Sequence, residues 1–253
     1  KPDVSVYKGM KVVTSSLPSS GGLVLGEILG MLSHFQIEKM DDVQRTHHIA
    51  EAMRRAYRDR AEYMGDPDYI DAPLNHLVSA AYIKQLADSI DKLKATPSLS
   101  LKAVMQPSGN GTDTTHFSVL DSQGNKVSAT LSINYPFGSC YVAKGTGVLL
   151  NDEMDDFSSK PGAPNVYGLV GTRANAIEPG KRMLSSMSPS IAVREDRISI
   201  FGTPGGSRLT NIVLIGVLDF YEGKTADEIV NDGRFHHQFL HDEISYEPGV
   251  LDE

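Results

Sequence analysis

The stretch QPSGNGTDTTHFSVLDSQGNKVSATLSIN, residues 106–134, decides how this chain is organised. It opens with a polar, glycine-rich loop and changes at Thr114 into residues that alternate between polar and apolar types. Turn residues at 121–125 separate this run from a second alternating run at 126–134, which predicts a β-hairpin of 116–120 with 126–134. A threonine at such a junction is usually an ordinary strand residue. If the Asp113–Thr114 bond were cut, however, Thr114 would carry a hydroxyl nucleophile and its own α-amine as base.

The composition describes an ordinary globular protein and excludes several kinds of partner. The 253 residues are 40% hydrophobic and 22% charged, and the net charge is −8. This charge argues against nucleic acid or an anionic membrane surface as a partner. No apolar run is long enough to span a bilayer, and the polar opening at Lys1 predicts no signal peptide. The single Cys140 excludes an internal disulfide and is expected to be a packed small residue.

The residues before the hairpin are expected to be mainly helical. Apolar residues recur at helical spacing after a loop of small residues, where Ser19 or Ser20 is the expected N-cap. The stretch 96–113 is expected to be an exposed, mobile connector. The expected elements are strands at 4–7 and 10–13 and helices at 23–35, 41–64 and 79–93. The arginines expected mostly to face water or to pair with carboxylates are Arg54, Arg55, Arg58 and Arg60.

The residues after the hairpin are rich in glycine and in strand patterns. Residues 158–187 form a loop of about thirty residues, and loops that long in a compact domain are usually functional lids or disordered. Thr225 begins a pattern typical of a capping box. The other expected elements are strands at 189–193 and 197–201 and a helix at 209–221.

Three features of this half could belong to a site, and each has an ordinary alternative. Pro204-Gly205-Gly206 lies between a strand and a helix, where free N–H groups attract negative charge and could form an oxyanion hole. An ordinary tight turn is the alternative. Ser185-Ser186 could bind a carboxylate or simply turn the chain. Asp155-Asp156 could bind an amino group or a metal, or form a solvated acidic turn.

The histidines and acidic residues do not have the spacing of a metal site. His236-His237 and His241 lack the spacing of a helical zinc site, and His47-His48 are adjacent and point to different faces. The aspartates at 66–71 do not fit an EF-hand loop. No metal and no cofactor are therefore expected.

Five ordered motifs resemble those of the γ-glutamyltranspeptidases. They are TTHFSV at 114–119, LLNDEMDDF at 149–157, KPGAPNVYGLV at 160–170, KRMLSSMSP at 181–189 and PGGSR at 204–208. They occur in the family's order and at about its spacing. The similarity continues upstream at 19–22 and 61–67 and downstream at 234–238, so it covers nearly the whole chain.

The resemblance implies an N-terminal-nucleophile hydrolase of the α+β class, an αββα sandwich that is incomplete here at both ends. Residues 1–113 would be the mostly helical C-terminal part of a large subunit. Residues 114–253 would be the β-rich catalytic part of a small subunit, formed when the precursor cleaves itself before Thr114. The remainder of the large subunit would be a partner, and a periplasmic or secreted location is implied.

The resemblance also implies catalytic roles. Thr114 would be the nucleophile, and Ser132 would place a hydroxyl against it at a position where the family usually carries threonine. Gly205 and Gly206 would form the oxyanion hole.

The implied substrate-binding residues would hold the two charged groups of a γ-glutamyl donor. Asn134, Glu153 and Asp156 would hold its α-amino group, and Ser185 with Ser186 would hold its α-carboxylate. Tyr167 would lie in a lid loop over the pocket. The arginine that binds the carboxylate in the family would lie upstream of this chain.

The implied reaction is transfer or hydrolysis of the γ-glutamyl group of glutathione and related compounds, with an amino acid, a peptide or water as acceptor. Two alternatives remain open. One is a related acylase acting on a cephalosporin or glutaryl side chain or on poly-γ-glutamate. The other is an uncleaved, inactive domain that only binds or assembles. Asp156 favours a donor with a free α-amine over the acylase alternative.

Overall fold

The computed structural model describes residues 1–101 and 114–251. The glycine-rich loop before Thr114 lies outside the described residues, as does most of the expected connector 96–113. The described start of that connector, η2 (Ser98–Leu101), is a 3-10 turn.

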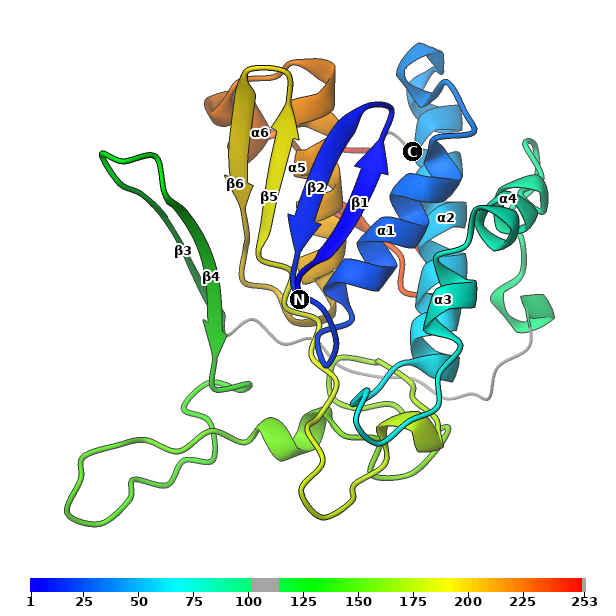
Figure 1. The fold of residues 1–253 in the computed structure, drawn as a ribbon. Coiled ribbons are helices and arrows are strands. Elements are labelled where there is room, and N and C mark those ends of the chain that lie inside the picture. The colour runs from blue at the N-terminus through cyan, green and yellow to red at the C-terminus, as the bar shows by residue number, and fades with distance from the viewer. Residues whose placement is uncertain (102–113, 252–253) are drawn as a thin grey trace.

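A four-stranded antiparallel sheet stands at the centre of the fold (Figure 1). Val12 pairs with Ala192 across the boundary between its second and third strands. Residues from before and after Thr114 therefore build one sheet together. In the order β1-β2-β5-β6 the strands are β1 (Asp3–Tyr7), β2 (Met10–Thr14), β5 (Ser190–Arg194) and β6 (Arg197–Phe201).

Helices cover one face of this sheet. α1 (Gly21–Leu32) and α5 (Leu209–Glu222) pack on the strands, and α2 (Asp42–Tyr63) and α4 (Ala80–Asp88) pack against α1 (Figure 1). The core between them is closed to solvent, because Leu25 and Leu214 are both 0% exposed. The short elements are α3 (Leu74–Leu77), α6 (Ala226–Asn231), β7 (Phe235–His236), β8 (Ser245–Tyr246), η1 (Ile37–Lys39), η3 (Glu153–Asp156), η4 (Arg173–Asn175) and η5 (Gly206–Arg208).

The opposite face of the sheet is apolar, and no described helix covers it. The strand register places side chains of the same face in rows across the four strands. Val4 and Val6 are 54% and 64% exposed, and Ile198 is 45% exposed. In an αββα sandwich a second sheet packs on this face, so the four-stranded sheet and its helices supply one helical layer and one sheet of that architecture. The two rows are Val4, Val13, Ile191 and Ile200, and Val6, Lys11, Val193 and Ile198.

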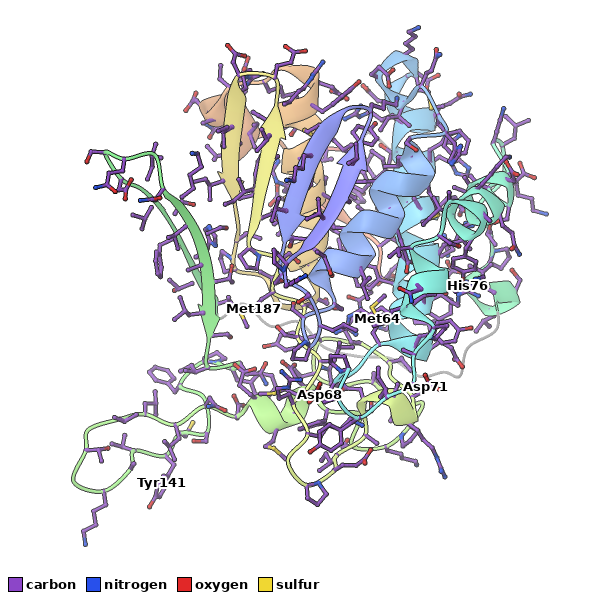
Figure 2. The ribbon with its side chains drawn as sticks, viewed as in Figure 1. Met64, Asp68, Asp71, His76, Tyr141 and Met187 are labelled. Carbon is purple, nitrogen blue, oxygen red and sulfur yellow. The ribbon has the colours of Figure 1, made fainter. Side chains whose placement is uncertain are left out.

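The expected hairpin is confirmed, and it lies beside β6. β3 (Thr114–Leu120) begins two residues earlier than expected, and β4 (Lys126–Ser132) ends two residues earlier because Asn134 takes a left-handed backbone with φ of 73°. Beyond it, a loop carrying Tyr141 reaches away from the sheet (Figure 2). The packed position expected for Cys140 in this loop is wrong, because its side chain is exposed.

Two expected helices are shorter than their sequence patterns indicate. The first ends at Leu32 rather than 35, where i to i−3 bonds from the next residues tighten the chain. α4 ends at Asp88 rather than 93, because the Ser89 carbonyl accepts a hydrogen bond from Arg55 Nη2 at 2.8 Å. The capping box at Thr225 is confirmed.

The arginines of α2 only partly follow expectation. Pairing with carboxylates is confirmed for three of them: Arg54 and Arg55 contact Glu51, and Arg58 contacts Asp59. The expectation is wrong for Arg60, which is only 5% exposed. Arg60 also pairs with no carboxylate of the described residues and donates to two serine hydroxyls.

Candidate active site

A cavity of about 30 Å³ brings together residues from six separate segments of the chain. Every residue to which the resemblance gives a role lines it except Gly205, which directly precedes a lining residue. Leu169, Met187 and Leu209 complete the wall and were not expected from the sequence. The expected residues in the wall are Thr114, Ser132, Asn134, Glu153, Asp156, Tyr167, Ser185, Ser186 and Gly206.

The hairpin register places Thr114 at this cavity. Thr114 opens β3 and pairs with Ser132 at the end of β4, and its hydroxyl donates to Ser132 Oγ at 3.2 Å. Ser132 Oγ also accepts the Asn134 N–H at 3.0 Å. Because successive strand residues face opposite sides, Thr115 is exposed on the other face.

The acidic part of the cavity is built on the 3-10 turn η3. Residues three apart on such a turn point to the same side, so Glu153 and Asp156 lie together and are both half-buried. Burial raises the pKa of Asp156 to about 8, and the charge of Glu153 adds to this rise while Arg60 opposes it. Burial likewise raises the pKa of Glu153. Two carboxyl groups in so little space favour sharing one proton, which the ammonium group of a ligand would displace.

The long loop 158–187 closes the site through Tyr167. The Tyr167 hydroxyl lies 2.8 Å from Asn134 Oδ1, and both residues are buried. Asn165 Oδ1 accepts the N–H groups of Tyr167 and Leu169 at 3.0 and 3.1 Å, which fixes the turn that carries the tyrosine. The loop is therefore folded onto the site.

The serine pair is joined to the start of α1. The Ser185 N–H donates to the Pro18 carbonyl at 2.9 Å, and the Ser20 N–H donates to the Ser185 carbonyl at 2.8 Å. A Cβ on Gly21 would lie 2.2 Å from Ser188 Oγ, so only glycine allows this approach. Ser20 is the N-cap residue as expected, but its hydroxyl donates to the Ser185 carbonyl instead of capping the helix.

The glycine turn meets the cavity at the start of α5. Gly205 and Gly206 have φ of 140° and 56°, values that favour glycine. The Tyr57 hydroxyl donates to the Ser207 carbonyl at 2.7 Å and holds the turn against α2. Across residues 1–101 and 114–251, the two glycine N–H groups have no hydrogen-bond acceptor, so they are available to an anion near a helix N-terminus.

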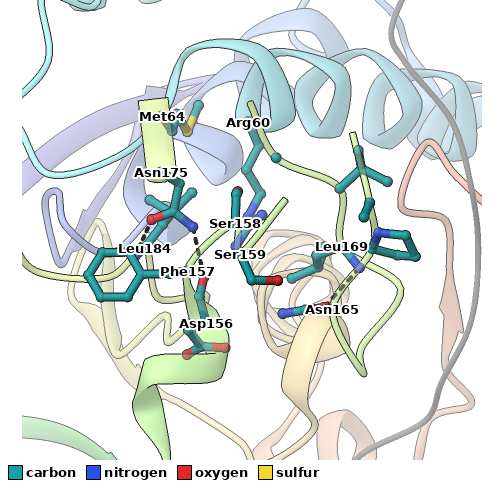
Figure 3. A pocket seen from close by; sticks show the side chains of 14 residues that line it. Arg60, Met64, Asp156, Phe157, Ser158, Ser159, Asn165, Leu169, Asn175 and Leu184 are labelled. Carbon is teal, nitrogen blue, oxygen red and sulfur yellow. Dashed lines mark hydrogen bonds between the residues drawn. The ribbon is translucent and has the colours of Figure 1, made fainter. Parts of the chain in front are cut away.

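Sequence reasoning missed Arg60, which reaches from α2 toward the loop at Ser158 and Ser159 (Figure 3). Its Nε donates to Ser20 Oγ at 2.9 Å and its Nη2 donates to Ser186 Oγ at 3.0 Å. The spacing contained a signal, since Arg60 continues the apolar stripe of Met53 and Tyr57 at helical intervals. A charged residue on a buried stripe is a candidate for a specific partner.

No metal site or membrane span is found in the described part of the chain. Within it, no group of three or more His, Cys, Asp or Glu side chains could hold a metal ion. None of the helices there has the length and apolar character needed to cross a bilayer.

Comparison with known proteins gives relatives along the whole chain. The sequence model of the family described as γ-glutamyltranspeptidase matches residues 1–253. The glutathione hydrolase proenzyme of Escherichia coli (strain K12) is 44% identical over 247 residues, which are 96% of this chain and 43% of that protein. The chain thus spans less than half the length of this relative.

Solved structures give the same result. The γ-glutamyltranspeptidase of Pseudomonas nitroreducens complexed with L-DON is 54% identical, with a TM-score of 0.50 over 52% of this chain and 70% of that one. The cephalosporin acylase of Bacillus halodurans has a TM-score of 0.75 over 99% of this chain and 43% of that one, at 22% identity, and so shares the fold. This chain belongs to the γ-glutamyltranspeptidase family and has the N-terminal-nucleophile hydrolase fold.

Proposed function

We propose that this chain carries the site that cleaves and transfers the γ-glutamyl group of glutathione and related compounds, with Thr114 as nucleophile after autoproteolysis before it. The observation that carries the proposal is the single cavity that holds the Thr114 hydroxyl, an acidic pair and a serine pair. A γ-glutamyl donor has a positive α-amine and a negative α-carboxylate. The acidic pair suits the first group and the serine hydroxyls suit the second.

The reaction would proceed through a covalent ester. The α-amine of Thr114, free after cleavage, takes the hydroxyl proton while Oγ1 attacks the γ-carbonyl carbon. The N–H groups of Gly205 and Gly206 would stabilise the resulting oxyanion. The carbon–nitrogen bond breaks as the leaving amine accepts the proton. Water or an acceptor amine then attacks the ester, which yields glutamate or a new γ-glutamyl amide and restores the Thr114 hydroxyl.

Burial and charge at the acidic pair support a γ-glutamyl donor over the acylase alternative. A glutaryl side chain has no α-amine, so Glu153 and Asp156 would remain without a cation to bind. Glutaryl anilide and γ-glutamyl anilide differ only in this amine. Faster turnover of glutaryl anilide would therefore favour the related acylase.

The division of the chain and its surroundings are also part of the proposal. Residues 1–113 would belong to the large subunit and residues 114–253 to the small subunit. The remaining part of a family chain would cover the bare face of the sheet, which is the apolar face opposite the helices. The relatives' greater length and the apolar rows on that face support this arrangement. A periplasmic or secreted location follows from the resemblance and stays a prediction.

The test uses two neighbouring threonines in the full chain. Intact mass under denaturing conditions should give a new fragment that begins at Thr114, and the protein should release aniline from γ-glutamyl anilide. Thr114→Ala should abolish both the cleavage and the release, because it removes the hydroxyl that serves both reactions. The exposed neighbour provides the matched control, so Thr115→Ala should keep both. An uncleaved, inactive wild-type chain would favour a domain that only binds or assembles.

A further inference from the structure

Arg60 is a buried arginine whose partners are hydroxyl groups. It is 5% exposed, and its hydrogen bonds go to Ser20 Oγ and Ser186 Oγ at 2.9 and 3.0 Å. No carboxylate of the described residues lies within 4.0 Å of its guanidinium. Burying a charge without an ion pair is costly, so stability alone gives a poor reason for arginine at this position.

These hydrogen bonds act on both members of the serine pair. Ser20 Oγ accepts from Arg60 and donates to the Ser185 carbonyl at 2.8 Å, so it links the guanidinium to the backbone of Ser185. Ser186 Oγ accepts directly from Arg60. A guanidinium can only donate, so the Ser186 hydroxyl keeps its own hydrogen for another acceptor. Hydrogen bonds in such a chain strengthen one another, which makes this hydroxyl a better donor to an anion.

Arg60 itself stands behind the site. It does not line the cavity that holds Thr114, but it lines a neighbouring cavity of about 20 Å³ (Figure 3). Asp156 lines both cavities. A positive charge placed directly behind two serines favours an anion in front of them.

We propose that Arg60 is a positioning residue for the α-carboxylate of the donor, which it serves by fixing Ser185 and Ser186 without touching the donor. This inference rests on the proposed γ-glutamyl transfer. The sequence motif points only to Ser185 and Ser186 as the residues that bind the carboxylate. The inference adds Arg60 of α2 as a cation that supports them.

The experiment compares Arg60→Met with Arg45→Met in the full chain. Arg45 is on the same helix, but it pairs with Glu222 away from the site. Two donors are used: γ-glutamyl anilide, and 4-aminobutanoyl anilide, which keeps the amine but lacks the α-carboxylate. Intact mass first establishes the extent of cleavage before Thr114 in each variant.

Arg60→Met should lower kcat/KM for γ-glutamyl anilide on the order of 10- to 100-fold, the range for hydrogen bonds to charged groups. Most of the loss should be in KM. The value for 4-aminobutanoyl anilide should change less than about threefold, and Arg60→Lys should restore part of the loss because it keeps the charge and some donors. Arg45→Met should behave as wild type for both donors.

A double-variant cycle gives an independent readout with γ-glutamyl anilide alone. If Arg60 acts through Ser186, the variant carrying Arg60→Met and Ser186→Ala should be little worse than Ser186→Ala alone. Ser20→Ala removes the hydroxyl that links Arg60 to the Ser185 carbonyl and leaves the Arg60–Ser186 contact in place. It should give a smaller loss, again for γ-glutamyl anilide and not for 4-aminobutanoyl anilide. This variant replaces Arg60→Met if Arg60→Met is not cleaved.

Equal losses for both donors, or fully additive losses in the cycle, would overturn the role of Arg60 and leave the proposed function intact. The proposed function fails separately if the cleaved wild-type protein does not turn over γ-glutamyl anilide.

Discussion

Glu153 and Asp156 face the same small cavity as the Thr114 hydroxyl, so the charge of this pair governs how the site responds to pH. Burial raises the pKa of Asp156 to about 8, and the charge of Glu153 pushes it further in the same direction. A carboxyl with a raised pKa is neutral below that pKa. An α-ammonium ligand should therefore bind more weakly as the pH falls through the pKa of Asp156.

We predict that Glu153→Gln moves this pH dependence to lower pH, because it removes the neighbouring negative charge. The measurement is the inhibition constant of L-glutamate, a product that does not react further, between pH 6 and 9. In the wild type the constant should rise by up to tenfold per pH unit below the pKa, as expected for one proton. The exposed Asp227 supplies the control variant Asp227→Asn, which should follow the wild type. Identical profiles for wild type and Glu153→Gln would show that the pair does not titrate together.

At the scale of elements, α1 and α2 meet at two polar contacts. One is the Ser20–Arg60 contact at the site. The other is a carboxyl pair inside the helix interface, where Glu27 of α1 lies against Asp59 of α2. Arg58 Nη2 lies 2.7 Å from Asp59 Oδ1, and the Tyr82 hydroxyl of α4 donates to Asp59 Oδ2 at 2.8 Å. Burial is the main cause that raises the pKa of both carboxyl groups, and the negative charge of Asp59 adds to the rise at Glu27.

We predict that Glu27→Gln stabilises the protein at pH 8 and not at pH 5. A carboxyl whose pKa is raised on folding contributes stability below its unfolded pKa, and this is lost as the pH rises through the folded pKa. Glutamine is a neutral amide of the same size, so the variant does not lose this stability as the pH rises. We expect the gain in the free energy of unfolding at pH 8 to be about 1–3 kcal/mol. Thermal unfolding at both pH values measures it, as an increase in Tm of a few degrees at pH 8. Glu62→Gln, at an exposed position of α2, should shift Tm equally little at both pH values. A similar gain for Glu27→Gln at pH 5 would count against a raised pKa of Glu27 as the cause.

At the scale of the whole molecule, the bare face of the sheet is an apolar surface on which no described helix packs. Its two rows contain seven aliphatic side chains and one lysine, Lys11. Contiguous apolar surface of this kind usually marks an interface. The position of β1 at the sheet edge leaves its backbone groups open to another strand as well.

We predict that Val6→Lys destabilises the full chain by about 2–4 kcal/mol, because a covered face would bury the new charge. Val230→Lys on α6 is the matched control. Val6 and Val230 are similarly exposed among the described residues, at 64% and 71%. The two substitutions should therefore differ in effect only if another part of the protein packs on the sheet face that carries Val6. Thermal unfolding of the two variants gives the comparison. Equal, small effects of about 0.5 kcal/mol would mean that the face stays open to water.

Much of the fold follows from local patterns in the sequence. Alternation predicted the hairpin and the strand pair of β5 and β6, and helical spacing predicted α2 and α5 within a residue or two. These patterns report which side chains avoid water along a single element, and a single sequence contains that information. The ends of α1 and α4 were placed too far along. Bonds of the i to i−3 type tighten the chain after α1, and a contact from Arg55 of α2 lies at the end of α4.

The sequence by itself determined the family, through five ordered motifs, and the residue types that a γ-glutamyl site requires. Only the tertiary structure decided that these residues meet in one cavity and that a β2–β5 pairing joins the two sides of Thr114 in one sheet. The tertiary structure also decided the buried position of Arg60. Its charge predicted a residue in water or beside a carboxylate, whereas the packing of α2 against α1 and the serine loop buries it between Ser20 and Ser186. Contacts between residues that lie from 40 to more than a hundred positions apart depend on how elements pack, and no local pattern contains them.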